Sequence, residues 1–221
     1  RWVMLLFASY YFYMSWNYMY IVLIAFSTIV DYIAGILLSK AERKPVRVLL
    51  LLASLGTNLG LLFFFKYWDF FVSFMNPFFD FLNISLDLPN HQQYADSTSL
   101  IDKIILPVGI SFYTFQTLSY TIDIFKRQRG PEYHFGKFAL FVSFFPQLVA
   151  GPIERSVNLL PQFHKHYKFD YERIKSGILL MTWGFFKKVV IADRLAEYVN
   201  LVYEHPHNFE GTPLILATVF F

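Results

Sequence analysis

The sequence predicts an all-α, polytopic membrane protein. Of its 221 residues, 56% are hydrophobic, 21% are aromatic and 16% are charged, whereas soluble domains carry about 25% charged residues. Several apolar stretches approach the length of a bilayer-crossing helix, which needs roughly 20 residues. The Lys and Arg residues between these stretches gather in a few loops, which is typical of multi-pass proteins.

The expected helices follow one another along a single membrane domain, residues 1–221. Apolar helices are expected over residues 2–14, 18–39, 48–65, 104–122 and 176–191, with a shorter interfacial helix over 70–82. A further apolar run begins near Thr212 and reaches the last residue. Because Arg1 leads directly into an apolar run, we interpret the chain as part of a longer protein.

Composition also argues against several classes of site. Cysteine is absent, which excludes a disulfide framework and a Cys-based metal site. The six histidines lie in polar stretches, and the pairs in "HKH" (164–166) and "HPH" (205–207) lack the carboxylates that would complete a metal site. The sequence has no Lys/Arg-rich face with interleaved aromatic residues, so nothing in it indicates a nucleic-acid partner. We therefore assign no metal ligand.

Loop charges predict the topology. The loops 40–47 and 126–137 each hold four Lys or Arg residues, whereas 83–99 holds none. Because Lys and Arg favour the cytoplasmic side, the first two loops are expected there and the third outside. The stretch 153–175 is also basic, so it too is expected on the cytoplasmic side.

The stretch "FALFVSFFPQLVAGPIER" (138–155), called the broken segment below, starts like a membrane helix but is interrupted by Pro146, Gln147, Gly151 and Pro152. It is too short to cross and has basic loops on both sides, so we expect it to be re-entrant. Irregular backbone at membrane depth is tolerated only where it is buried in protein or lines a watery cavity. We therefore expect this segment to edge a cavity near the cytoplasmic side.

The stretch 105–125, which precedes the broken segment and is expected to be helical, carries two polar stripes. One stripe consists of Ser111, Thr114, Thr117 and Thr121, and the other of Gln116, Ser119 and Asp123. Such residues pack helices closely and form hydrogen bonds between them. Two interpretations stay open: both stripes pack against neighbouring helices, or the second stripe lines a path for substrate.

Two acidic residues lie in or near the expected spans. Asp123 precedes Lys126 and Arg127 by three and four residues, a spacing that predicts an ion pair on a helix. Asp31 is expected about 13 Å from the basic loop at 1.5 Å per residue. An intramembrane acid is a functional hypothesis by default, and structural pairing is the alternative for both residues.

Four stretches together resemble the membrane-bound O-acyltransferase (MBOAT) family, in particular its alginate O-acetyltransferase-like branch. They are "STIVDYIAG" (27–35), "LPVGISFYTFQTLSYTIDIFK" (106–126), "FFPQLVAGPIER" (144–155) and "FFKKVVIADRLA" (185–196). The second and third motifs, in this order, are the most specific, and the resemblance covers nearly the whole chain.

The resemblance implies a helical fold around a tunnel in the bacterial cytoplasmic (inner) membrane. An acyl group from a cytoplasmic donor, acetyl-CoA or another acyl thioester, would pass to a hydroxyl of a cell-envelope or exported polysaccharide or to a periplasmic acetyltransferase partner. In this family an intramembrane histidine in a Trp- and Arg-rich motif acts as the base. None of the six histidines lies in such a motif, so the chain is expected to be an N-terminal part that ends before the catalytic half, and no catalytic residue is assigned.

The motif positions supply the candidates for substrate binding, which are Gln116, Asp123, Gln147, Glu154 and Arg155. A secondary transporter is the alternative function, because transporters also use broken helices and polar intramembrane faces. A transporter is expected to show paired broken segments in repeated halves, whereas the sequence shows one.

Overall fold

The computed structural model describes residues 1–15, 17–84, 88–90, 107, 109–148, 151–152, 154–165 and 167–221. Across these residues the regular secondary structure is helical and no strand occurs, which confirms the all-α prediction. The chain divides into two compact units, Arg1–Lys165 and His166–Phe221, and each is described by itself. The assignment of all 221 residues to one membrane domain stays a prediction.

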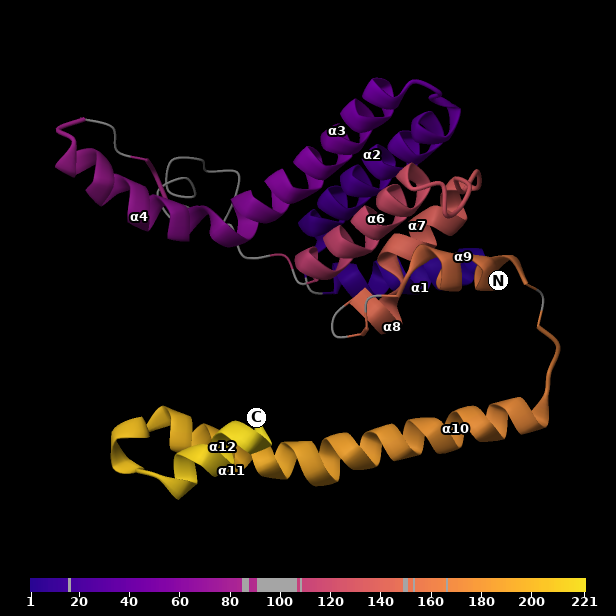
Figure 1. Ribbon diagram of the computed structural model, residues 1–221. Helices are drawn as coiled ribbons and strands as arrows, with labels where there is room; N and C mark the ends of the chain where they lie inside the picture. Colours follow the sequence, from indigo (N-terminus) through magenta and orange to yellow (C-terminus); the bar gives the residue numbers. More distant parts are fainter. Residues whose placement is uncertain are drawn as a thin grey trace. The chain divides into compact units, whose positions relative to one another are not determined.

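The first unit is a bundle of helices that contains the N-terminus (Figure 1). Its helices are α1 (Trp2–Met14), α2 (Ile21–Lys40), α3 (Lys44–Leu62), α4 (Trp68–Phe81), α6 (Ile110–Phe125), α7 (Phe135–Ser143), α8 (Phe145–Leu148) and α9 (Ser156–His164).

Two helical runs of the described residues are long and apolar enough to cross a membrane. They are Tyr18–Lys40, with 23 residues, and Lys44–Phe81, with 38 residues. The first matches the span expected over 18–39, and the second contains the span expected over 48–65 but extends beyond it at both ends. The helix α6 has 16 residues, and the start of the span expected over 104–122 lies outside the described residues.

The helices α3 and α4 form one continuous run, joined by a π-helical turn at Phe63–Tyr67. The prediction of a separate interfacial helix over residues 70–82 is therefore wrong in its boundary. No Gly or Pro stands between residues 61 and 76 to end the helix, and Trp68 and Phe71 both pack their rings against Phe63 across the turn. Of the predicted loop 83–99, residues 85–87 and 91–99 lie outside the described part.

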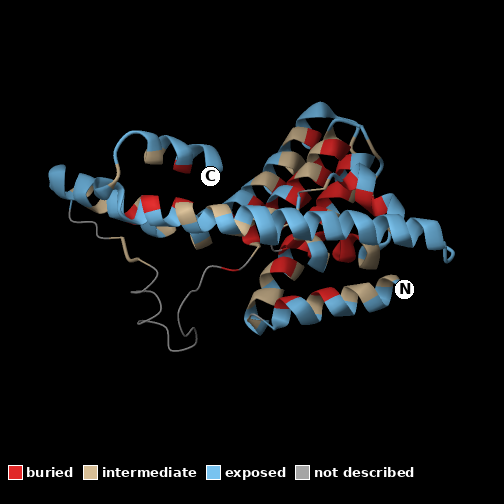
Figure 2. Cartoon of the chain, turned by 90° about the horizontal axis from the view of Figure 1, so that it is seen from below, coloured by how far each residue is buried: buried red, intermediate tan, exposed pale blue. Residues whose placement is uncertain are grey.

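The centre of the first unit is α6, which packs against α2, α3 and α7. Tyr120 is fully buried, and its ring centroid lies 4.5 Å from that of Phe138 on α7. A Cβ added to Gly35 on α2 would lie 2.7 Å from the Tyr120 hydroxyl oxygen, so only glycine allows this close approach. Figure 2 shows the buried residues concentrated in this bundle.

Arg47 ties together the ends of two helices. Its guanidinium is buried and donates to the carbonyl of Leu38 in α2 at 2.7 Å and to that of Phe125 in α6 at 2.6 Å. Carbonyls in the last turn of a helix lack intrahelical partners, and a cation there is also favoured by the helix dipole. The loops that follow α2 and α6 therefore lie at the same end of the bundle, as the charge pattern predicts.

The second unit consists of α10 (Tyr171–Phe185), a π-helical segment (Phe186–Ala192), α11 (Asp193–Glu204) and α12 (Thr212–Phe220). The helix expected over 176–191 therefore exists but is longer. Val199, Val202 and Ala217 are buried where α11 and α12 pack together. The helix α10 is exposed along its whole length (Figure 2).

Candidate functional site

The broken segment interrupts its helix at Phe144. The helix α7 ends at Ser143, Phe144 has φ −57° and ψ 107°, and the single turn α8 begins at Phe145. In an unbroken helix the Phe145 N–H would bond to the Phe141 carbonyl, four residues earlier. Both groups are released by the break, so each needs another partner.

Side chains from two other helices supply these partners. The Phe141 carbonyl accepts from Nε2 of Gln116 on α6 at 2.7 Å, and the Phe145 N–H donates to Oγ of Ser9 on α1 at 3.3 Å. Gln116 is 3% exposed, and an unmatched buried polar group would be costly. The amide of Gln116 also lies 3.4 Å from Oε1 of Gln147 on α8. The second polar stripe of α6 therefore supports the break.

Glycine residues allow the backbone to approach closely on both sides of α8. Gly109 caps α6 with φ +76°, and an added Cβ would lie 2.4 Å from the Leu148 carbonyl oxygen. An added Cβ at Gly151 would lie 2.5 Å from Cα of Gln147. The glycine at 151 thus lets the chain turn sharply after α8, and the glycine at 109 brings α8 to the N-terminal end of α6.

The chain then returns to the C-terminal end of α6. The Ser156 hydroxyl donates to the Asp123 carboxylate at 3.1 Å, and Arg129 donates to the Ser156 carbonyl at 2.6 Å. The 16 residues of α6 correspond to about 24 Å at 1.5 Å per residue. The described residues therefore lie beside α6 first at Phe138, near Tyr120, then at Leu148, near Gly109, and the chain is back beside Asp123 at Ser156, as the re-entrant interpretation predicts.

Asp123 does not form the predicted ion pair. It is 8% exposed and accepts from Ser156, and no ion pair among the described residues joins it to Lys126 or Arg127. Arg127 has φ +57°, so the helical spacing on which the prediction depended ends before it. The neighbouring Arg129 lies over the Tyr120 ring at 5.5 Å; burial lowers the pKa of Arg129, against the opposing effects of Tyr120, Glu132 and Asp123.

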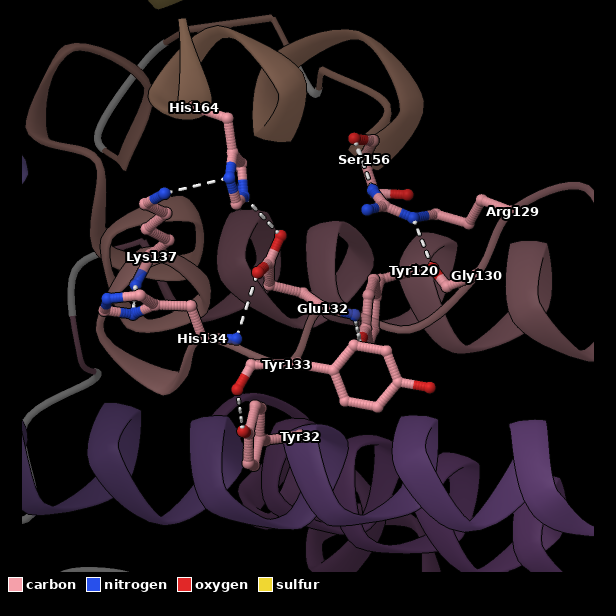
Figure 3. Close-up of polar contacts among 10 residues, drawn as sticks. All are labelled: Tyr32, Tyr120, Arg129, Gly130, Glu132, Tyr133, His134, Lys137, Ser156 and His164. Atoms are coloured by element: carbon pink, nitrogen blue, oxygen red, sulfur yellow. Dashed lines mark hydrogen bonds and ion pairs between the residues drawn. The ribbon is translucent and has the colours of Figure 1, made fainter.

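A second polar cluster lies where the loop before α7 meets the end of α9 (Figure 3). Glu132 is 7% exposed; its Oε2 lies 2.8 Å from Nε2 of His164, and its Oε1 accepts from the His134 N–H at 3.0 Å. On the other side of the imidazole, Nζ of Lys137 lies 2.8 Å from Nδ1 of His164. An open cavity of about 670 Å³ borders this cluster, lined by Pro131, Glu132, Tyr133, His134, Phe135, Gly136 and His164.

The loop that carries Glu132 is fixed by two tyrosines. The Tyr120 hydroxyl accepts from the Glu132 N–H at 3.0 Å, and the Tyr32 hydroxyl donates to the Tyr133 carbonyl at 2.6 Å (Figure 3). Both tyrosines belong to long helices of the bundle, α6 and α2. The buried carboxylate is therefore held by a rigid backbone.

The first polar stripe of α6 faces a different cluster, centred on Asp31 of α2. The carboxylate is fully buried and accepts from Oγ of Ser54 at 2.6 Å and from Nδ2 of Asn58 at 2.9 Å, both on α3. Oγ of Ser54 lies 3.4 Å from Oγ1 of Thr121. Structural pairing, one of the two alternatives for Asp31, is thus present, and it uses neutral donors.

The five candidates for substrate binding fall into two groups. Gln116, Asp123 and Gln147 lie around the broken segment, whereas Glu154 accepts from Asn158 at 3.3 Å and Arg155 is exposed at the start of α9. Their role in binding stays a prediction. The contacts of Ser9 with Phe145 and of His164 with Glu132 and Lys137 were not predicted, because the partners lie 136, 32 and 27 residues apart in the chain and leave no spacing pattern.

Comparison with known proteins finds bacterial relatives along most of this chain. The chain is 32% identical to a peptidoglycan O-acetyltransferase of Helicobacter pylori over 90% of its length, and this covers 40% of that protein. It is 34% identical to a probable alginate O-acetylase AlgI of Pseudomonas aeruginosa over 88% of its length, covering 35% of that protein. A probable alginate O-acetylase AlgI of Azotobacter vinelandii is 33% identical over 88% of the chain.

The chain thus spans 35% to 40% of the length of the first two relatives. No family model matches it, and no solved structure matches it. The matches to these relatives nevertheless extend over 88% to 90% of this chain. The resemblance to the alginate O-acetyltransferase-like branch of the membrane-bound O-acyltransferases is therefore confirmed.

Proposed function

We propose that the protein to which this chain belongs is a multi-pass O-acetyltransferase of the bacterial cytoplasmic membrane. Its acceptor is a hydroxyl of a cell-envelope or exported polysaccharide, reached directly or through a periplasmic acetyltransferase partner. Its donor is acetyl-CoA or another acyl thioester on the cytoplasmic side. The similarity to enzymes named for O-acetylation of peptidoglycan and alginate is the observation that carries this proposal.

The geometry of the broken segment supports the same proposal. The freed backbone groups of Phe141 and Phe145 are bonded to side chains, so the break is a built feature of the fold. Irregular backbone at membrane depth is tolerated where it is buried in protein or lines a cavity. An acyl transfer across a membrane needs such a polar, protein-lined region, and Gln116, Asp123 and Gln147 are our candidates for contact with substrate there.

A transporter would use a broken helix differently. Transporters of the inverted-repeat type build their sites from discontinuous helices in corresponding positions of two halves. Within the described residues one apolar helix is broken, at Phe144, and the relatives above are named for O-acetylation. The acyltransferase is therefore the better-supported function.

The experiment measures O-acetyl esters on the polysaccharide in cells that express the full-length protein, normalised to inserted protein. The double variant Pro146→Leu with Gly151→Leu should lose acetylation, because an added Cβ at Gly151 meets the backbone of Gln147. The matched control is Pro77→Leu, which also removes a helical proline but at an exposed position. Wild-type protein that adds no acetyl ester would overturn the proposed function, and full activity of the double variant would show that the break is dispensable.

The predicted topology has its own test. Single cysteines at Lys126 and Ser97 in this cysteine-free stretch are treated with a thiol reagent that does not cross the membrane. Lys126→Cys should be protected in intact cells and Ser97→Cys labelled, because the Lys/Arg-rich loop favours the cytoplasm. The reverse pattern would invert the orientation and place the donor on the wrong side.

A further inference from the structure

The two flanks of the broken segment meet at three side chains. Glu132 and Lys137 precede the segment, and His164 follows it. Oε2 of Glu132 and Nζ of Lys137 each lie 2.8 Å from a ring nitrogen of His164 (Figure 3). A Lys ammonium can only donate, so it donates to Nδ1 of His164. The imidazole therefore carries its proton on Nε2 and donates it to the Glu132 carboxylate.

This arrangement joins an anchored group to a movable one. Glu132 is buried; its carboxylate accepts from the His134 N–H in the same loop, and its backbone N–H donates to the Tyr120 hydroxyl of α6. His164 is the last residue of α9, and its side chain is 45% exposed. The first turn of α9 is held separately, through Ser156 and its bonds to Asp123 and Arg129. The His164 bonds thus fix the other end of α9.

The position of α9 matters for the break because the two are close in the chain. Only the residues from 149 to 155 separate α8 from α9, and Leu159 and Leu160 of α9 are buried against the core. Phe163, one residue before His164, packs its ring against Phe144, the residue at the break, with centroids 5.5 Å apart. A displaced α9 would therefore remove a direct support of the break.

We propose that Glu132, His164 and Lys137 form a clasp that holds α9 against α7 and thereby keeps the broken segment folded back. The three residues are positioning residues, and their effect on acyl transfer rests on the proposed function. Opening the clasp frees the end of α9, loosens the contact between Phe163 and Phe144, and moves the break away from its partners on α6 and α1.

The first test reads the position of α9 without using activity. Leu160 is fully buried, and in the full-length protein a cysteine at this position should react slowly with a maleimide. Adding His164→Ala, which removes the bonds, or Glu132→Gln, which leaves at most a neutral bond, should raise the labelling rate about tenfold, the effect of losing about 1.4 kcal/mol of charge-assisted bonding. The control is His207→Ala, an exposed histidine of the second unit. Unchanged labelling in both clasp variants would overturn the clasp.

The second test asks whether holding α9 is all that the clasp does. Glu132→Cys with His164→Cys removes the polar bonds, and a reducible bis-methanethiosulfonate reagent then bridges the two thiols. Acetylation should fall about tenfold in the double variant, again the effect of losing about 1.4 kcal/mol of charge-assisted bonding, return on cross-linking and fall again on reduction. The cross-link itself is verified by mass spectrometry of the joined peptides.

Different outcomes of these two tests would overturn the clasp and the proposed function. Acetylation that stays low in the cross-linked protein would overturn the positioning role, because the side chains would then be needed for more than holding. Normal acetylation in variants with raised labelling would show that the clasp does not serve the reaction. Raised labelling in variants of a protein that shows no acetylation at all would leave the clasp standing and remove the proposed function.

Discussion

The two polar faces of α6 make different kinds of hydrogen bond with their buried side chains. On the face toward α3, Thr121 meets Ser54, which donates to Asp31, and the backbones of the three helices stay regular. On the face toward the broken segment, Gln116 donates to a backbone carbonyl that a break has released. The first face joins intact helices through side chains, and the second replaces missing backbone bonds.

The difference shows where function is expected in this fold. A network between intact helices can be removed in matched pairs, because apolar side chains of similar shape would pack the same helices together. A side chain that satisfies a released carbonyl has no such substitute unless the helix is made continuous. Substitutions on the first face should therefore change stability, and those on the second face should change activity beyond any change in stability.

The largest expected effect is that of Gly109→Ala, beside the broken segment. At φ +76° a residue other than Gly costs about 1–2 kcal/mol, and the new Cβ would lie 2.4 Å from the Leu148 carbonyl oxygen. The start of α6 and the end of α8 must then move apart. We expect most of the acetylation to be lost, measured as O-acetyl ester per inserted protein.

The matched control for this variant is Gly130→Ala. Gly130 is exposed, has no positive φ, and has nothing within 4 Å of an added Cβ. Acetylation close to wild type is expected there. If Gly109→Ala were equally active, the close approach of α6 and α8 would not matter for the reaction, and the contrast between the two faces would be lost.

The next effect belongs to the intact face. Asp31→Leu leaves the Ser54 hydroxyl and the Asn58 amide without their acceptor, and each unmatched buried group costs about 1–3 kcal/mol. The unfolding temperature in detergent should fall, and acetylation per folded protein should stay near wild type. A double variant with Asn58→Leu should recover part of the loss, and the double-mutant cycle measures the coupling. A single variant that folds normally but is inactive would give Asp31 a functional role instead.

Local patterns explain why much of the fold could be predicted. The apolar runs gave α1, α2 and α3, and the Lys/Arg asymmetry placed the loops after α2 and α6 at one end, where Arg47 joins them. The spacing of polar residues on α6 predicted two faces, and each face has buried partners. These features depend on residues that are near one another in the chain, so a sequence pattern records them.

Contacts between distant residues could not be predicted in this way. The clasp joins residues 32 apart in the sequence, and Phe145 meets Ser9 across 136 residues. Asp123 accepts from Ser156 instead of pairing with Lys126 or Arg127, and Arg127 loses its helical spacing because the helix ends at Phe125 and Arg127 takes a left-handed conformation. Helical spacing holds only inside the helix, and nothing in the local sequence shows that Ser156 returns to Asp123.

A smaller effect is expected for Gln116→Leu on the broken face. It leaves the Phe141 carbonyl without its 2.7 Å donor, which costs about 1–3 kcal/mol if no water replaces it. Acetylation per folded protein should fall more than the unfolding temperature predicts. The control is Ser119→Ala, since the Ser119 hydroxyl on the same stripe donates to the Gln116 carbonyl of its own helix and, within the described part of the chain, bonds to no other helix. Equal activity of the two variants would mean that α6 does not support the break.

The smallest effect is expected for Ser9→Ala on α1. The Ser9 hydroxyl accepts from the Phe145 N–H at 3.3 Å, which is longer than the usual 2.7–3.2 Å for an N–H donor. A neutral hydrogen bond contributes about 0.5–1.5 kcal/mol in general, and alanine has a higher helix propensity than serine, which offsets part of the loss. We expect acetylation to fall less than in Gln116→Leu. The double variant Ser9→Ala with Gln116→Leu should lose more than the sum of the two losses, because each residue holds one of the two groups released at the same break and either can partly hold the break alone. Strict additivity in this cycle would show that the two bonds act independently, and the view that α1 and α6 support one break together would then be wrong.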